Sequence, residues 1–192
     1  MNVLPSSPRA QSLAGLALLA ILVSTPVRAA LESSMSLHML LQFPGLMLGG
    51  ALLSAAAPMR MRRLLAPWNE LGISGLVAVV LSLTVLMIPR VLDLALVEPG
   101  VEAAKIAALA ACGALLRHSW HMGGLLIQAF FLGNLLPMMG VVGSLYDNAP
   151  IRLCNAYLLG DQQRLGQGLV GLSIAIALIW LAYAARIVMR RP

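Results

Sequence analysis

Residues 169–188 read LVGLSIAIALIWLAYAARIV and contain one charged side chain, Arg186, close to their end. The run is about as long as the roughly 20 apolar residues that an α-helix needs to cross a bilayer. Its apolar side chains are continuous and do not alternate with polar ones, which is typical of a membrane-spanning helix and not of a strand in a barrel. We therefore expect a chain built from α-helices that cross a membrane.

The composition of the whole chain agrees with this expectation. Of its 192 residues, 60% are hydrophobic and 10% are charged, and the mean hydropathy is +0.89. Soluble domains carry about 25% charged residues, and disordered chains are poor in apolar residues. The composition therefore excludes an ordinary soluble domain and a disordered chain.

Four more apolar runs precede the last one. They cover residues 37–57, 71–89, 101–116 and 122–145. The third is the weakest, because Glu102 and Lys105 enter its outer end, where Lys105 is expected to extend its side chain outward. We predict an all-α fold, a polytopic transmembrane helical bundle with five spans, in which residues 30–192 form a single membrane domain.

Residues 1–29 have the pattern of a signal peptide. Arg9 is the only charge before a short apolar run at 13–23, and the small residue Ala29 follows soon after it. A positive start, a short apolar middle and a small residue at the exit are typical of such a segment, with cleavage expected after Ala29. The alternative is an uncleaved first transmembrane helix, which would bring the number of spans to six.

The basic residues predict the orientation of the chain in the membrane. A basic loop at 60–63 separates two apolar runs, and the chain ends with Arg190 and Arg191. Because Lys and Arg mark the cytoplasmic side, we expect this loop and the C-terminus in the cytoplasm. Six of the seven acidic residues then fall on the outer side: Glu32, Asp93, Glu98, Glu102, Asp147 and Asp161.

The net charge of +6 does not indicate a nucleic-acid partner. The 13 basic residues lie mostly at the ends of apolar runs and form no stripe with interleaved aromatic residues. Membrane lipid is the partner that the composition predicts. The sequence also lacks the motifs of a catalytic serine, a phosphate-binding loop and a zinc protease, so we do not expect an enzyme.

His38 is the most informative polar residue within an apolar run. Gln42 follows it by four residues and Met35 precedes it by three, so the three share one face of a helix, and Met39 is adjacent. A histidine and a glutamine are costly in a membrane span unless they face a partner or a ligand. Imidazole and thioether groups together suit Cu(I). The alternative is an interfacial histidine that forms a hydrogen bond to a neighbouring helix.

Other polar residues have structural interpretations. His118 and His121 form an H-x-x-H pair expected on the cytoplasmic side, where an interfacial role is favoured over metal binding. Asp161 is a candidate N-cap of the last helix. Pro137 should kink the fourth run, with Asn134 available to bind the backbone groups that the proline frees.

Small residues and cysteines complete the pattern. Gly45 and Gly49 form a G-x-x-x-G spacing, which favours close packing of helices in lipid. Cys112 lies in an apolar run and Cys154 in a polar loop, so we expect no disulfide between them.

Four segments together resemble the CtaG family of membrane proteins, which is associated with assembly of cytochrome c oxidase and its copper centre. Residues 38–41, HMLL, are similar to that family's H-M-L-L segment, and residues 88–96, IPRVLDLAL, to its L-P-x-L-Y-D-x-A-L loop. The LPM at 136–138 matches a penultimate span, and DQQ at 161–163, with Gly166, matches D-Q-Q-x-x-G at the mouth of the last span. The resemblance extends over most of the predicted membrane domain.

The resemblance implies an inner-membrane protein of the respiratory chain that assists copper insertion or maturation of a respiratory oxidase at the periplasmic side. Its cofactor would be copper, and its partner a cytochrome c oxidase subunit or another copper protein. The implied metal ligands are His38, Met35, Met39 and Met87. The residues implied to line the same outer mouth are Gln42, Asp161 and Gln162.

The chain departs from the family at the other histidines of that family. Their positions fall on Ser34 and Met87 and near Glu102 and Ile106, so His38 is the one retained. Met87 would be a soft replacement, and it is also an ordinary apolar residue for its run. The alternative function is therefore a non-catalytic structural subunit or scaffold of a larger membrane complex with no metal site. A small-molecule transporter is a third alternative.

Overall fold

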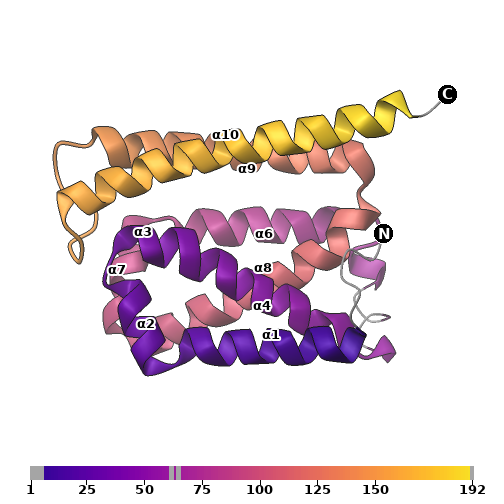
Figure 1. The fold of residues 1–192 in the computed structure, drawn as a ribbon, viewed down its shortest axis with the longest axis horizontal. Helices are drawn as coiled ribbons and strands as arrows, with labels where there is room; N and C mark the ends of the chain where they lie inside the picture. The colour runs from indigo at the N-terminus through magenta and orange to yellow at the C-terminus, as the bar shows by residue number, and fades with distance from the viewer. Residues whose placement is uncertain (1–6, 61–62, 64–65, 191–192) are drawn as a thin grey trace.

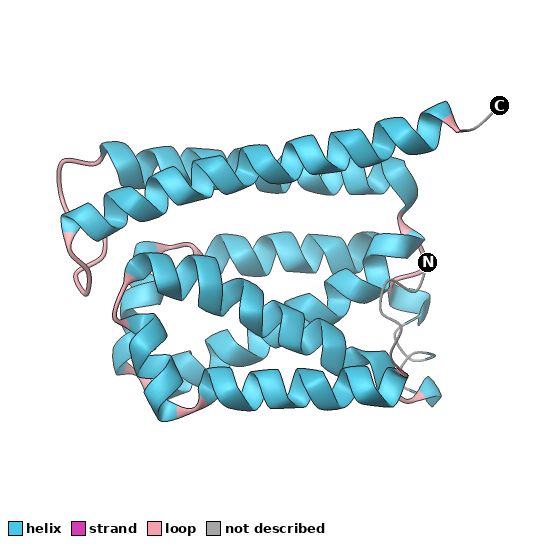
Figure 2. Cartoon of the chain, in the orientation of Figure 1, coloured by secondary structure: helices cyan, strands magenta, loops and turns pink. Residues whose placement is uncertain are grey.

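The computed structural model describes residues 7–60, 63 and 66–190. Within these residues the chain is helical, with short connecting loops and no strand (Figure 1, Figure 2). The predicted all-α fold is confirmed.

Within the described residues, four helices are long and apolar enough to cross a membrane. The first extends from Met35 to Ala56 and comprises α3 (Met35–Leu37), the π-helical turn η1 (His38–Gln42), α4 (Phe43–Leu53) and η2 (Ser54–Ala56). The others are α8 (Pro99–Met122), α9 (Gly124–Asn148) and α10 (Leu159–Met189). The chain is therefore a multi-pass membrane protein that contacts lipid.

The described chain also contains two bent pairs of shorter helices and, after the first long span, the 3₁₀ turn η3 (Ala66–Trp68). The pairs are α1 (Pro8–Val23) with α2 (Thr25–Glu32), bent by 66°, and α6 (Ile73–Leu86) with α7 (Pro89–Val97), bent by 76°. Proline in the first turn of α2 and of α7 explains the bends, because proline fits a helix start but cannot continue the preceding helix. If each pair is one span, the described chain has up to six spans.

The first helix, α1, packs along α4 in the bundle (Figure 1). The two backbones approach so closely that a Cβ on Gly15 would lie 2.7 Å from the carbonyl oxygen of Gly49. Ser12 Oγ also donates a hydrogen bond of 2.8 Å to the carbonyl oxygen of Leu53. Since Gly49 belongs to the predicted G-x-x-x-G spacing, α1 is the helix that packs against it. Cleavage after Ala29 and an uncleaved first span both stay predictions.

The long helices lie side by side, so the bundle has two ends (Figure 1). One end, called here the α2–α7 end, is formed by α2, α7 and the loop 149–158. The start of α1, the segment after α4 and the C-terminal end of α10 lie at the other. That segment carries Arg60 and Arg63, while Met61, Arg62 and Arg191 lie outside the described residues. The described parts of the predicted cytoplasmic segments, the basic loop and the C-terminal end, therefore share one end, whereas Arg28 of α2, Arg90 of α7 and Arg152 of the loop 149–158 belong to the α2–α7 end.

Two details differ from the expectations. The last helix begins at Leu159, two residues before the candidate N-cap Asp161, because its polar first turns continue the helix beyond the apolar run at 169–188. Pro137 lies inside α9, where it lacks the N–H that would bond to Gly133. The amide of Asn134 donates to the carbonyl oxygen of Phe130 at 2.7 Å, so it does not bind the group that the proline frees.

Candidate functional site

His38 is fully buried at the start of its span, in the π-helical turn η1. The backbone N–H of Phe43 donates to the carbonyl oxygen of His38, one residue further along than in an α-helix. Such turns are rare and occur frequently at functional sites. The predicted face is present, since Met35, Met39 and Gln42 are all buried with His38.

Lys105 of α8 is 2% exposed and does not extend outward as predicted. Four acceptors surround its Nζ: Oε2 of Glu102 at 2.7 Å, Nε2 of His38 at 2.8 Å, Oε1 of Gln42 at 3.3 Å and Oε1 of Glu32 at 3.4 Å. The prediction was wrong because the interior supplies these partners. An outward path would also leave the buried carboxylate of Glu102 without its counter-charge.

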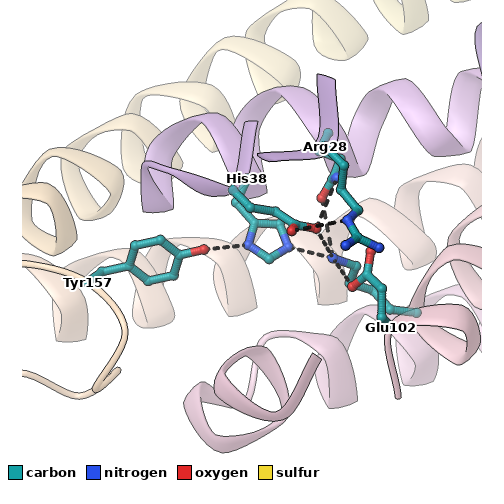
Figure 3. Close-up of polar contacts among 7 residues, drawn as sticks. Arg28, His38, Glu102 and Tyr157 are labelled. Atoms are coloured by element: carbon teal, nitrogen blue, oxygen red, sulfur yellow. Dashed lines mark hydrogen bonds and ion pairs between the residues drawn. The ribbon is translucent and has the colours of Figure 1, made fainter. Parts of the chain in front are cut away.

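The contact with Lys105 sets the protonation of His38. An ammonium group only donates hydrogen bonds, so the facing Nε2 must accept and the ring proton lies on Nδ1. Nδ1 in turn donates to the hydroxyl oxygen of Tyr157 at 2.7 Å (Figure 3). His38 is therefore a neutral imidazole whose two ring nitrogens are both engaged, as in the hydrogen-bonding alternative considered above.

Two carboxylates and a second cation complete the group. Glu102 lies three residues before Lys105 on α8 and is 5% exposed. Glu32, the last residue of α2, pairs at 3.5 Å with the half-exposed Arg28 (Figure 3). The two carboxylates thus balance the two cations. We call this group the polar centre, and it comprises Arg28, Glu32, His38, Gln42, Glu102, Lys105 and Tyr157.

The loop that carries Tyr157 is held by α7. Asp93 accepts hydrogen bonds from the backbone N–H groups of Asn155 at 2.9 Å and Ala156 at 3.3 Å. These two residues directly precede Tyr157, so the carboxylate fixes the backbone from which the tyrosine reaches His38. Asp93 is the acidic residue of the IPRVLDLAL segment.

Asp161 holds the start of the histidine-bearing span. It accepts hydrogen bonds from the backbone N–H of Met35 and, at 2.8 Å, from the hydroxyl of Ser34. It was expected to cap its own helix, but α10 begins two residues earlier, at Leu159, and the carboxylate caps α3 instead. This cap satisfies a free N–H in the first turn of the span. It thereby fixes the start of the helical segment that carries His38.

Gln162 holds the loop 149–158 from within the bundle. Its Oε1 accepts from the backbone N–H of Leu153 at 2.8 Å, and its Nε2 donates to the carbonyl oxygen of Tyr146 at 3.1 Å. The side chain is 1% exposed. Asp161 and Gln162 therefore bind backbone groups of neighbouring segments. The resemblance had implied that they line an open mouth together with Gln42, and the structure does not place them so.

The same loop buries a thiol and a phenol. Burial, with the nearby charge of Asp93, raises the pKa of Cys154 to about 12. Burial, with the charge of Glu32, also raises the pKa of Tyr157. Both groups therefore stay protonated at neutral pH. Cys154 and Cys112 are free, in agreement with the expectation of no disulfide.

The predicted copper ligands lie in surroundings that do not suit a copper ion. Met35, Met39 and Met87 belong to one apolar core cluster, together with Met139 and Leu165. A copper ion at Nε2 of His38 would meet the ammonium of Lys105. No group of three or more His, Cys, Asp and Glu side chains within the described chain is placed to hold a metal ion. As arranged, these residues do not fit copper, which stays a prediction without a supporting contact here.

Sequence reasoning missed part of the polar centre. The signal for Glu102 and Lys105 was present, because opposite charges three residues apart inside an apolar run point to a buried pair. Nothing in the sequence connects Glu32 or Tyr157 with His38, since loops and other helices bring them together.

Comparisons with protein-family models, curated proteins and solved structures find no match to this chain.

Proposed function

We propose that the chain is a non-catalytic scaffold in a bacterial inner membrane that assists assembly of a larger membrane complex. The resemblance makes a respiratory oxidase the first candidate. One observation carries the proposal: the segments that resemble the oxidase-assembly family meet at one place. His38, Asp93, Asp161 and Gln162 come from three of those segments, and together they hold the polar centre and the loop beside it.

The bonding of the polar centre supports a scaffold more than a metal carrier. The imidazole of His38 and the ammonium of Lys105 find their hydrogen-bond partners inside the bundle, and these contacts tie the start of the Met35–Ala56 span to α8 and to the loop 149–158. Four apolar cavities of about 300 to 580 Å³ open elsewhere on the described surface, and none of these four is lined by His38 or Lys105. We infer that the polar centre holds the elements of the α2–α7 end in place.

The α2–α7 end is the proposed surface for the partner, facing the periplasm. The described residues of the basic loop, Arg60 and Arg63, and the C-terminal end of α10 lie at the opposite end, which would then be cytoplasmic. The loop 149–158 is held from α7 and α10 while Ile151 and Leu158 stay 66% and 74% exposed. A fixed loop with exposed apolar side chains suits contact with another membrane subunit.

A tagged chain purified from its own membranes in mild detergent tests the proposal. We expect co-purification of oxidase subunits in a fixed ratio, and a lower level of assembled oxidase, read from its haem absorbance, when the gene is deleted. A chain that purifies alone, with oxidase unchanged in the deletion strain, would contradict both the scaffold and its candidate partner.

A triple variant separates the scaffold from a copper carrier. Met35→Leu, Met39→Leu and Met87→Leu together remove the thioethers and keep most of the packing volume. We expect this variant to restore oxidase assembly in the deletion strain as well as the unaltered chain does. If the variant accumulates normally but the oxidase lacks copper, the chain acts as a copper carrier and the scaffold proposal fails.

A further inference from the structure

We propose that the ammonium group of Lys105 is the resident cation of the polar centre and that it occupies a place which a divalent metal ion would otherwise take. The chain would then exclude metal with a tethered charge. The contacts around Lys105 carry this proposal, and they are the same whichever complex the chain serves.

The atoms that surround Nζ are of the kinds that bind metal ions. They are an imidazole nitrogen, two carboxylate oxygens and one amide oxygen, all between 2.7 and 3.4 Å away. Imidazole and carboxylate are ligands of Zn²⁺ in proteins. An ammonium group has three N–H donors for these four acceptors, and none of the four needs a proton of its own to make the contact.

The charge around Nζ exceeds what one ammonium balances. Glu32 and Glu102 both face Nζ, so the shell carries two negative charges against the one positive charge of Lys105. Arg28 offsets the other charge from the edge of the group. Both carboxylate oxygens of Glu102 are buried without a hydrogen-bond partner among the described residues, and Oε2 meets Nζ as an ion pair at 2.7 Å. The shell therefore has more negative charge and more acceptor capacity than one ammonium uses.

The support behind His38 is that of a metal-binding histidine. Such a histidine usually donates its other ring N–H to a fixed acceptor, which orients the ring. His38 does this with Tyr157, whose loop is held in turn by Asp93 (Figure 3). Nε2 is thereby aimed at the position of the cation, as it would be for a metal.

The size of the ammonium explains why the shell is open. Zn²⁺ ligands lie at about 2.0 to 2.2 Å, closer than any acceptor lies to Nζ. The ammonium keeps the acceptors apart, which agrees with the absence of a preformed metal group in the described part of the chain. Loss of the lysine side chain would let the flexible side chains of Glu32 and Glu102 close around a small ion.

Metal content of the purified full chain tests the inference. Zn²⁺ and Cu(I) are offered separately, excess metal is removed, and bound metal is counted per chain. We expect the unaltered chain to retain neither. Lys105→Ala should retain equimolar Zn²⁺ and melt at a higher temperature with Zn²⁺ than without, and both effects should disappear in Lys105→Ala/His38→Ala.

Lys105→Met is the matched control. It removes the charge but keeps a side chain of similar length in the place of the ion, so we expect it to retain no Zn²⁺. Equimolar metal in the unaltered chain that depends on His38 would overturn the inference. A folded Lys105→Ala chain that binds no Zn²⁺ would overturn it equally.

A further variant covers the case in which Lys105→Ala does not accumulate. Glu102→Gln removes the buried carboxylate that the ammonium balances. If Lys105 is there as the cation of this shell, Lys105→Ala/Glu102→Gln should restore accumulation. Failure of both Zn²⁺ and Glu102→Gln to rescue the Lys105→Ala chain would show that the lysine acts through something other than its charge, and the inference would be wrong.

Discussion

Nζ of Lys105 lies 2.8 Å from Nε2 of His38, although the two residues are 67 positions apart and belong to different spans. The contact joins α8 to the π-helical turn at the start of the Met35–Ala56 span. It uses the ring nitrogen that a metal would need and fixes the imidazole as neutral. The packing of α8 against the start of this span thus determines whether His38 is open to a metal ion.

Loss of one partner of the ion pair between Lys105 and Glu102 should destabilise the fold, whereas loss of both charges together should be tolerated. Lys105→Met leaves a buried carboxylate without its partner, and breaking one side of a buried pair costs about 3–5 kcal/mol. Lys105→Met/Glu102→Gln should recover most of this loss. Thermal unfolding in detergent, followed by circular dichroism, measures both. Equal destabilisation by the single and the double variant would contradict the pairing.

The hydroxyl of Tyr157 should stabilise the fold through His38. Tyr157→Phe removes the acceptor of the Nδ1 proton and leaves a buried donor unsatisfied, which costs about 1–3 kcal/mol. Tyr183→Phe is the control, because Tyr183 is 49% exposed. The melting temperature should fall for the first variant and stay within error for the second. A similar effect of both would remove the special role of the contact.

The thiol of Cys154 should be unreactive below strongly alkaline pH. With its pKa near 12, roughly a thousandth of the thiol is ionised at pH 9, where an ordinary cysteine is largely ionised. In a Cys112→Ala background, maleimide labelling should be slow in the folded chain and fast after denaturation.

The same pKa shift predicts how stability depends on pH. The pKa of Cys154 is higher in the folded chain than in the unfolded chain. The contribution of this thiol to the stability of the fold is therefore fully present below about pH 9 and is lost as pH rises toward 12.

Asp93→Asn removes the charge that helps to raise the pKa of Cys154, so this substitution should speed maleimide labelling of Cys154. Unchanged labelling in that variant would leave burial as the whole cause.

Close packing between α4 and α8 should depend on Gly113. A Cβ there would press on the backbone carbonyl of Met47, whereas a Cβ on Gly133 of α9 meets nothing within 4 Å. Gly113→Leu should therefore destabilise the bundle by about 1–3 kcal/mol or more, as overpacking does, and Gly133→Leu should be tolerated. Accumulation in membranes and melting in detergent compare the two. Equal tolerance would mean that α4 and α8 do not meet there.

The sequence by itself determined the class of fold and the approximate spans. A membrane-spanning helix needs about 20 apolar residues, and its backbone N–H and C=O groups must all be paired. A long apolar run can therefore adopt few structures other than such a helix. The run at 37–57 is thus observed as Met35–Ala56. Hydropathy does not predict where α10 begins. This helix starts at Leu159 in polar sequence, because helix propensity does not end at the edge of the hydrocarbon.

Only the tertiary structure decided the partners of His38. Hydropathy fixes which residues enter the membrane but not which helices become neighbours, so the approach of Lys105, Glu32 and Tyr157 could not be foreseen. The face shared by His38 and Gln42 followed from helical spacing, whereas the cation that it meets depends on how α8 packs against α4. Lys105 turns inward because four acceptors surround its ammonium there, and that arrangement exists only once the spans have assembled.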